Sequence, residues 1–354
     1  MRAPRARMIS IVIAATCATG AAASLWGTMQ HRVAYEPIAE AIEPDVASDT
    51  RSVAVKDGYL YLLERTGDLH VYDVTGLPQV IGFATYDTPL SSLSVASNRG
   101  LLRRGSTLYG FTYTGIEVFD ISTASTPQYV DFVGAAHIYN LIEHEGLLIS
   151  CAASEVVVYG IGASPIPVEI GSHPLGSGNW AWSAAVFGSV LYVGQLNLSD
   201  PLQNGLLILD FQDPTNPFHI DFIQMDEIEV PYHLAIVDGD LIATGDFGIR
   251  LYDLTNPSAP ALADEETTQG RVRAVDGPYV ITNGHVFLVQ GGALQPVAGF
   301  DPVYMQNDGY PFGSAVDSGF VFLAQSERIL ILDTRLFADG FETGDMTRWS
   351  AAVP

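Results

Sequence analysis

Polar and aromatic residues stand at the start of several strand-like runs in this sequence. Aromatic, amide, imidazole and guanidinium groups of this kind would suit a small polar or anionic ligand if the fold brought them together. The alternative is that they hydrogen-bond to one another and to water, as buried polar groups generally must. The residues concerned are Arg51, Asn140, Trp182, His233, Arg271 and Arg273.

No catalytic signature accompanies these residues. The sequence contains no G-x-S-x-G elbow, H-E-x-x-H helix, Walker loop, G-x-G-x-x-G fingerprint or CxxC pair. Cys151 directly follows the apolar run 147–150, which is typical of a small core residue rather than a nucleophile. The histidines are scattered, and their spacing does not indicate the three or four converging ligands that zinc needs.

The candidate residues lie in units that repeat along the chain. A short strand ending in an acidic residue recurs five times, and two degenerate copies fill the gaps, so that seven units are present. The mean period is about 43 residues, which falls in the range of a four-stranded propeller blade. The acidic copies are 69–74, 116–121, 206–211, 249–254 and 329–334, and the degenerate copies are 156–161 and 285–290.

Each unit also has the turn residues of a four-stranded antiparallel sheet. Pairs such as Asp57-Gly58 between two apolar runs predict tight hairpins, because glycine tolerates a positive φ. Asx-type side chains and prolines, as in Asn256-Pro257, stop the strand after the acidic residue. The sequence therefore predicts an all-β fold, a seven-bladed β-propeller over residues 37–334. A β-sandwich array is the alternative, although it would not need a constant period.

The two ends of the repeat predict how the ring closes. The last unit ends at Thr334 without a fourth strand, whereas the segment 37–42 resembles the fourth strand at 78–83. We expect this N-terminal strand to complete the seventh blade and to hide its edge. The first strand of each blade would then line a central channel, and the candidate residues would surround its mouth. For Trp180 and Trp182 we prefer core packing in the fourth blade over a sugar platform.

The strand-and-turn unit resembles a known repeat. The segment 248–260, which reads GIRLYDLTNPSAP, is similar to the LVIVD repeat of secreted or surface β-propellers of bacteria and archaea. The resemblance covers nearly all of residues 37–334. It implies a propeller and an extracytoplasmic setting, and the family has no shared catalytic residues to carry over.

The first 23 residues have the layout of a secretory signal peptide. Arg2, Arg5 and Arg7 precede the apolar run 8–18, and the small residues 21–23 follow it. The apolar run is shorter than the roughly 20 residues that cross a bilayer, and no later stretch suits a membrane span. We therefore expect residues 24–36 to be a linker and the product to be secreted or extracytoplasmic, in the periplasm or at the cell surface.

The charge of the chain limits its partners. The net charge is -24 and Lys56 is the only lysine, so no basic surface can release counterions from phosphates. Nucleic acid and anionic membranes are therefore unexpected partners. If the signal peptide is removed, Cys151 is the only cysteine left and no intramolecular disulfide can form. We expect a monomer stabilised by packing.

The residues 335–354 are expected to form a separate tail. The segment 336–350 is similar to a C-terminal motif, F-x-D-G-F-E-x-G-D-x-x-x-W-S, of otherwise unrelated secreted proteobacterial proteins. Its terminal position suggests sorting or surface retention, and the alternative is a tail that caps one edge of the ring. Asp339, Glu342 and Asp345 could hold Ca²⁺ with backbone carbonyls, although their spacing is not that of an EF-hand loop. No other cofactor is expected.

Three classes of function are consistent with these features. The favoured hypothesis is a non-enzymatic, secreted or cell-surface interaction module whose ring presents loops to a protein or glycan partner. The second is a propeller that binds a small ligand or a metal at the channel mouth. The third is a hydrolase or lyase built on the loops, since propellers host many chemistries.

Overall fold

The computed structural model divides the chain into two units, residues 1–32 and 33–354, and the residues it describes lie in the second unit. The expected signal peptide (1–23), the C-terminal tail (335–354) and Arg271 lie outside the described residues, and so do Asp339, Glu342 and Asp345. The described residues are 34–35, 39–42, 50–64, 68–77, 80–86, 98–135, 137–225, 230–245, 247–267, 272–282, 285–300, 314–317, 320–325 and 328–333.

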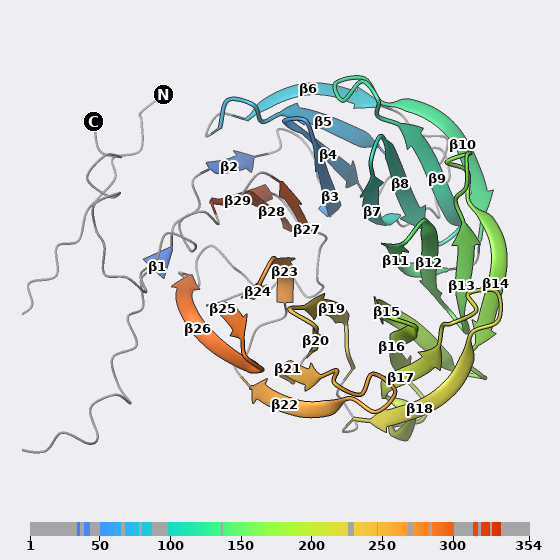
Figure 1. Ribbon diagram of the computed structural model, residues 1–354. Coiled ribbons are helices and arrows are strands. Elements are labelled where there is room, and N and C mark those ends of the chain that lie inside the picture. Colours follow the sequence, from blue (N-terminus) through green and yellow to red (C-terminus); the bar gives the residue numbers. More distant parts are fainter. Residues whose placement is uncertain are drawn as a thin grey trace, which may run out of the picture. The chain divides into compact units, whose positions relative to one another are not determined.

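The first five sheets each contain four strands, and strands that are consecutive in the chain are neighbours in the sheet (Figure 1). Every pair of neighbouring strands within them is antiparallel. The first sheet is β3 (Thr50–Lys56), β4 (Tyr59–Glu64), β5 (Leu69–Asp73) and β6 (Ile81–Tyr86); the second is β7 (Asn98–Arg104), β8 (Thr107–Thr112), β9 (Gly115–Asp120) and β10 (Gln128–Gly134); the third is β11 (Ile138–His144), β12 (Leu147–Ala152), β13 (Glu155–Gly160) and β14 (Val168–Pro174); the fourth is β15 (Asn179–Phe187), β16 (Val190–Asn197), β17 (Gly205–Asp210) and β18 (Phe218–Gln224); the fifth is β19 (His233–Val237), β20 (Asp240–Gly245), β21 (Gly248–Asp253) and β22 (Ala261–Glu266).

The last two sheets each take one strand from the N-terminal segment. In the seventh sheet, β2 (Ala39–Ile42) runs antiparallel to β29 (Arg328–Asp333), with Ala39 opposite Ile331 and Ile42 opposite Arg328. In the sixth sheet, β1 (Ala34–Tyr35) runs parallel to β26 (Ala293–Phe300), so part of the segment expected to be a linker is a short strand that covers a sheet edge. The remaining strands are β23 (Val272–Asp276), β24 (Tyr279–Thr282), β25 (His285–Gln290) and β26 (Ala293–Phe300) in the sixth sheet, and β27 (Ser314–Asp317), β28 (Phe320–Gln325) and β29 (Arg328–Asp333) in the seventh.

The expected all-β fold is confirmed. Within the described residues the only helix is one 3-10 turn, η1 (Pro201–Gln203), in the connection between β16 and β17. None of the described helical segments has the length and apolar character needed to cross a membrane.

The hairpin turns form where the sequence predicts them. Asp57 and Gly58, which join β3 to β4, have φ values of 51° and 75°, and Asp238 and Gly239, which join β19 to β20, have φ values of 52° and 86°. Two consecutive residues with positive φ match the right-handed twist of the flanking strands. These local signals therefore determine the strand ends reliably.

The acidic residue that ends the third strand of a sheet forms a turn with its own loop. The Asp253 Oδ1 atom accepts hydrogen bonds from the backbone nitrogen of Thr255 at 2.6 Å and from the Thr255 hydroxyl at 2.6 Å. The Asp73 Oδ1 atom is bonded in the same way to Thr75, at 2.9 and 2.6 Å. These bonds, first from the threonine hydroxyl and then from its backbone, lower the pKa of both carboxyl groups. The repeated aspartate is therefore a strand stop.

Neighbouring sheets pack face to face through shared apolar clusters. The first strands contact one another in the order β3, β7, β11, β15, β19, β23, β27 and again β3. Figure 1 draws these strands toward the middle of the described sheets, and fourth strands such as β10, β14 and β22 toward the outside. One cluster joins the first and seventh sheets, with Val53 and Leu60 against Phe322 and Ile331. The described core thus lies between sheets.

Three buried tyrosines connect one sheet to a loop of another. Each lies on the second strand of its sheet, is 0% exposed, and donates its hydroxyl proton to a backbone carbonyl 56 to 65 residues later. The receiving loop joins the third and fourth strands of the second, third or fifth sheet. Burial raises the pKa of all three phenols. The bonds are Tyr61 to Ala124 (2.6 Å), Tyr109 to Pro165 (2.9 Å) and Tyr192 to Pro257 (2.8 Å).

Candidate functional site

The first strands share a β-bulge near their beginning. In five sheets the pairing register skips one residue of the first strand, so that this residue has no partner on the second strand. A bulge of this kind turns a side chain out of the regular alternation and is common next to binding sites. The skipped residues are Arg51, Arg99, Tyr139, Trp182 and Arg273.

Three of the six residues selected from the sequence occupy this bulge, namely Arg51, Trp182 and Arg273. The side chains of the two arginines lie outside the described part of the chain. In the third sheet the selected residue was Asn140, whereas the bulged residue is Tyr139. Asn140 is half-buried, and its Oδ1 atom accepts a hydrogen bond from the backbone nitrogen of Leu141 at 2.8 Å. The side chain of Asn140 therefore bonds to the backbone of the next residue.

His233 begins β19 and presents an unusual polar group. The side chain is half-buried, and its Nδ1 atom is buried with no hydrogen-bond partner among the described residues. Burial disfavours the charged imidazolium and lowers the pKa of His233 to about 4. The ring is therefore neutral at neutral pH.

Five aromatic side chains from neighbouring sheets meet beside these bulges, and we call them the aromatic cluster. The Tyr139 ring stacks on Trp182, with centroids 5.0 Å apart and planes at 17°, and on Trp180 at 5.6 Å and 15°. Tyr232 lies edge-on to Trp182 at 5.5 Å, and Tyr113 lies edge-on to Tyr139 at 6.0 Å. All five are half-buried. Stacked and edge-to-face pairs hold such rings in fixed positions.

The two tryptophans, for which we expect core packing, lie on the less buried side of β15. Along β15 the burial alternates, so that Asn179, Ala181 and Ser183 are buried while Trp180 and Trp182 are half-buried on the other face. The alternation holds from Asn179 to Ser183 and stops after the bulge, so the two tryptophans share the less buried side. Only the fold reveals that Tyr139 of the adjacent sheet stacks against them.

Cys151 lies in the apolar cluster between the third and fourth sheets, as the sequence predicts, and is fully buried on β12. Burial in apolar surroundings raises the pKa of its thiol. In the part of the chain that the structure describes, no group of three His, Cys, Asp or Glu residues is placed to hold a metal ion.

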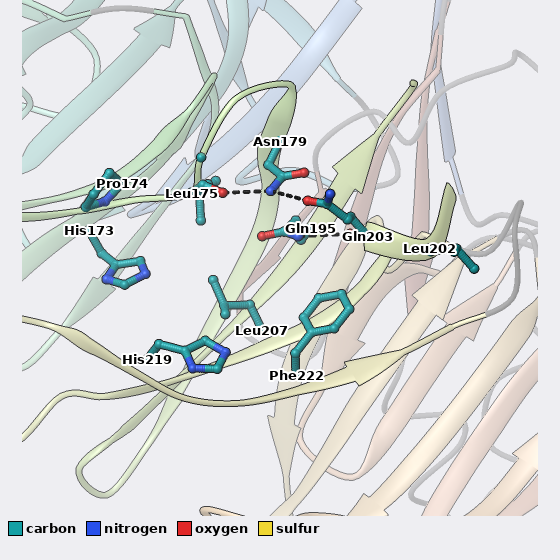
Figure 2. A pocket seen from close by; sticks show the side chains of 11 residues that line it. His173, Pro174, Leu175, Asn179, Gln195, Leu202, Gln203, Leu207, His219 and Phe222 are labelled. Atoms are coloured by element: carbon teal, nitrogen blue, oxygen red, sulfur yellow. Dashed lines mark hydrogen bonds between the residues drawn. The ribbon is translucent and has the colours of Figure 1, made fainter. Parts of the chain in front are cut away.

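A pocket of about 370 Å³, which the sequence analysis missed, lies between the third and fourth sheets (Figure 2). One wall comes from the connection between β16 and β17, residues 198–204, which contains η1. The equivalent connections in the other sheets have two to four residues, for example 113–114 and 65–68. The greater length of this connection is visible in the sequence and could have indicated the pocket. The lining residues are His173, Pro174, Leu175, Gly176, Asn179, Gln195, Leu202, Gln203, Leu207, His219 and Phe222.

Amide side chains fix the wall of this pocket. Asn179 Nδ2 donates to the Leu175 carbonyl at 2.6 Å and to Gln203 Oε1 at 2.9 Å, and Gln195 Nε2 donates to the Gln203 carbonyl at 2.9 Å. Asn197 Nδ2 donates to Asn179 Oδ1 at 2.6 Å. A connected network of this kind holds its members in single orientations.

Comparison with known proteins supports a propeller-like fold. Residues 47–88, which span the first sheet, match the model of the LVIVD repeat. No curated protein matches the chain in sequence. A chain in the crystal structure of the mitotic checkpoint complex is 14% identical with a TM-score of 0.63, and the match covers 92% of this chain and 98% of that one. The computationally designed Ika8 protein is 12% identical with a TM-score of 0.54, covering 84% of this chain and 100% of that one. At these identities the likeness concerns the fold alone.

Proposed function

We propose that this chain is a secreted or cell-surface binding module, a seven-bladed propeller that binds a protein or glycan partner at the aromatic cluster. The ring is supported by the cyclic order of contacts among the first strands, from β3 to β27 and back to β3. The apolar cluster shared by the first and seventh sheets supports closure, as does the pairing of β2 with β29. A closed ring leaves no free sheet face at either end of the repeat.

The extracytoplasmic location rests on two sequence features. Residues 1–23 have the basic, apolar and small-residue segments of a signal peptide. The second feature is the resemblance of the segment 248–260 to the repeat of secreted or surface propellers, which implies the same setting.

The observation that carries the binding function is the half-buried aromatic cluster. Its rings come from the second, third and fourth sheets and from the segment before β19, and their mutual contacts hold them in place. Large rigid aromatic side chains lose little entropy on binding and dominate the energy of many interfaces. A partner that covers Trp182 and Tyr139 would complete their burial, which explains why rings of this size are left partly exposed.

The proposal is tested by capture on the immobilised chain. Envelope extract and a glycan array are applied to the wild type, to Trp182→Ala and to a control, Tyr129→Ala, which removes a 44% exposed aromatic residue from β10. We expect Trp182→Ala to weaken capture at least about thirtyfold, since a central aromatic residue contributes roughly 2 kcal/mol or more. The control should bind like the wild type. Capture that is at background, or equal for Trp182→Ala and wild type, would refute the proposal.

A further inference from the structure

We infer that the pocket between the third and fourth sheets is a second binding site, and that its ligand is a neutral sugar unit. The first argument is the origin of the pocket. In repeat proteins, insertions into a single repeat commonly build the binding face. Here residues 198–204 lengthen the connection between β16 and β17 and supply Leu202 and Gln203 to the pocket wall.

The second argument is that the wall has an unused acceptor held in place. Gln195 is 6% exposed, and its Nε2 atom is committed to the Gln203 carbonyl. No hydrogen bond within the described residues reaches its Oε1 atom. In Figure 2 this oxygen points away from Gln203, toward the space beside Leu175. An accessible amide oxygen in such a position, on a side chain that is otherwise buried, favours a ligand that donates a hydrogen bond.

The imidazole of His173 supplies a second acceptor. Its Nδ1 atom lies 3.1 Å from the Pro217 carbonyl oxygen. A carbonyl can only accept, so Nδ1 carries a proton, and in the tautomer that fits this contact Nε2 has the free lone pair of an acceptor. Figure 2 shows His173 and His219 on one side of Leu207 and the amide side chains on the other. The polar groups are thus at two ends of the pocket, with an apolar surface between them.

The lining determines the class of ligand. It includes no Asp, Glu, Lys or Arg, and its apolar part includes Leu175, Leu202, Leu207 and Phe222. Phosphate diesters and carboxylates offer acceptors only, so they cannot pair with the Gln195 oxygen, and the net charge of -24 disfavours an anion. A sugar ring presents hydroxyl donors around its edge and C–H groups on its face. That combination fits both the acceptors and the apolar surface.

The test is saturation-transfer difference NMR on the full chain. The probes are glucose, galactose, mannose and N-acetylglucosamine, with glucuronate as a charged counterpart. We expect at least one neutral sugar to bind with a dissociation constant on the order of 1 mM, as for a ligand of about a dozen heavy atoms, and glucuronate to give no signal.

Two variants test whether the sugar binds in the pocket. His173→Phe removes the Nε2 acceptor but keeps a ring, and Leu202→Ala trims the inserted wall at a 61% exposed position. We expect each to weaken binding at least about fivefold. The controls are His144→Phe, a half-buried histidine outside the pocket, and Leu262→Ala, a 52% exposed leucine on β22, and both should bind like the wild type. Absence of signal from all four neutral sugars, or unchanged affinity in both pocket variants, would overturn the inference.

Discussion

At the scale of single residues, the structure assigns different roles to groups that look alike in the sequence. Asp73 and Asp253 end their strands by accepting hydrogen bonds from Thr75 and Thr255. This turn explains why an aspartate recurs at the end of the third strand. His233, by contrast, has a buried Nδ1 atom with no described partner. The two groups respond to acid for different reasons, since the aspartates lose hydrogen bonds and the histidine resists gaining a charge.

We predict that His233 makes the protein less stable between pH 6.5 and 4. The pKa of His233 falls from 6.5 to about 4 on folding, so the folded ring stays neutral while the unfolded ring gains a proton. Stability is complete above pH 6.5 and declines as the pH falls toward 4, by at most about 3 kcal/mol. Urea unfolding at several pH values checks this. In His233→Gln the decline should be shallower by this amount, and an identical decline would contradict the prediction.

At the scale of elements, bulges and interlocking side chains adapt a regular sheet to its neighbours. The bulge at Tyr139 and Trp182 brings two first strands to a shared aromatic contact. Tyr109 reaches from β8 to the loop between β13 and β14 and donates to Pro165. A hydrogen bond of this kind fixes how far one sheet is rotated against the next, because apolar packing alone has no direction.

We predict that Tyr109→Phe destabilises the fold by about 1 kcal/mol. The variant keeps the buried ring but removes the hydroxyl that donates to Pro165 at 2.9 Å, and a net hydrogen bond contributes about that amount. Urea unfolding measures the change. The matched control is Tyr129→Phe, since Tyr129 is 44% exposed and its hydroxyl has no hydrogen bond among the described residues. Equal losses in the two variants would show that the inter-sheet bond contributes nothing.

At the scale of the whole second unit, the N-terminal segment 34–42 contributes strands to the last two sheets. Its strand β2 supplies the fourth strand of the last sheet, and β1 adds a parallel strand to the sixth. Pairing the first residues of the unit with the last sheet joins the ends of the repeat. It also removes a strand edge that would otherwise be open to another chain.

We predict that deleting residues 1–42 destabilises the protein by roughly 2–4 kcal/mol and promotes aggregation, since β29 loses the four residue pairs it makes with β2. Deleting only residues 1–32, which belong to the separate unit, is the control and should leave unfolding unchanged. Thermal unfolding and size-exclusion chromatography measure both effects. If the two deletions behave alike, the N-terminal strand does not hold the sheets together.

The sequence alone determined the all-β fold, the repeated unit and most strand ends. Apolar runs, Asp-Gly pairs and strand-ending aspartates act within a few residues, so their effect can be read locally. The sequence placed Asn140 at the channel mouth, and the bulge falls on the neighbouring Tyr139, because a bulge shifts the side-chain alternation by one residue and leaves no local mark. The aromatic cluster, the Tyr109 bond and the pocket beside Gln195 were decided only by tertiary structure. Their members come from different sheets, and which of them meet depends on how those sheets pack.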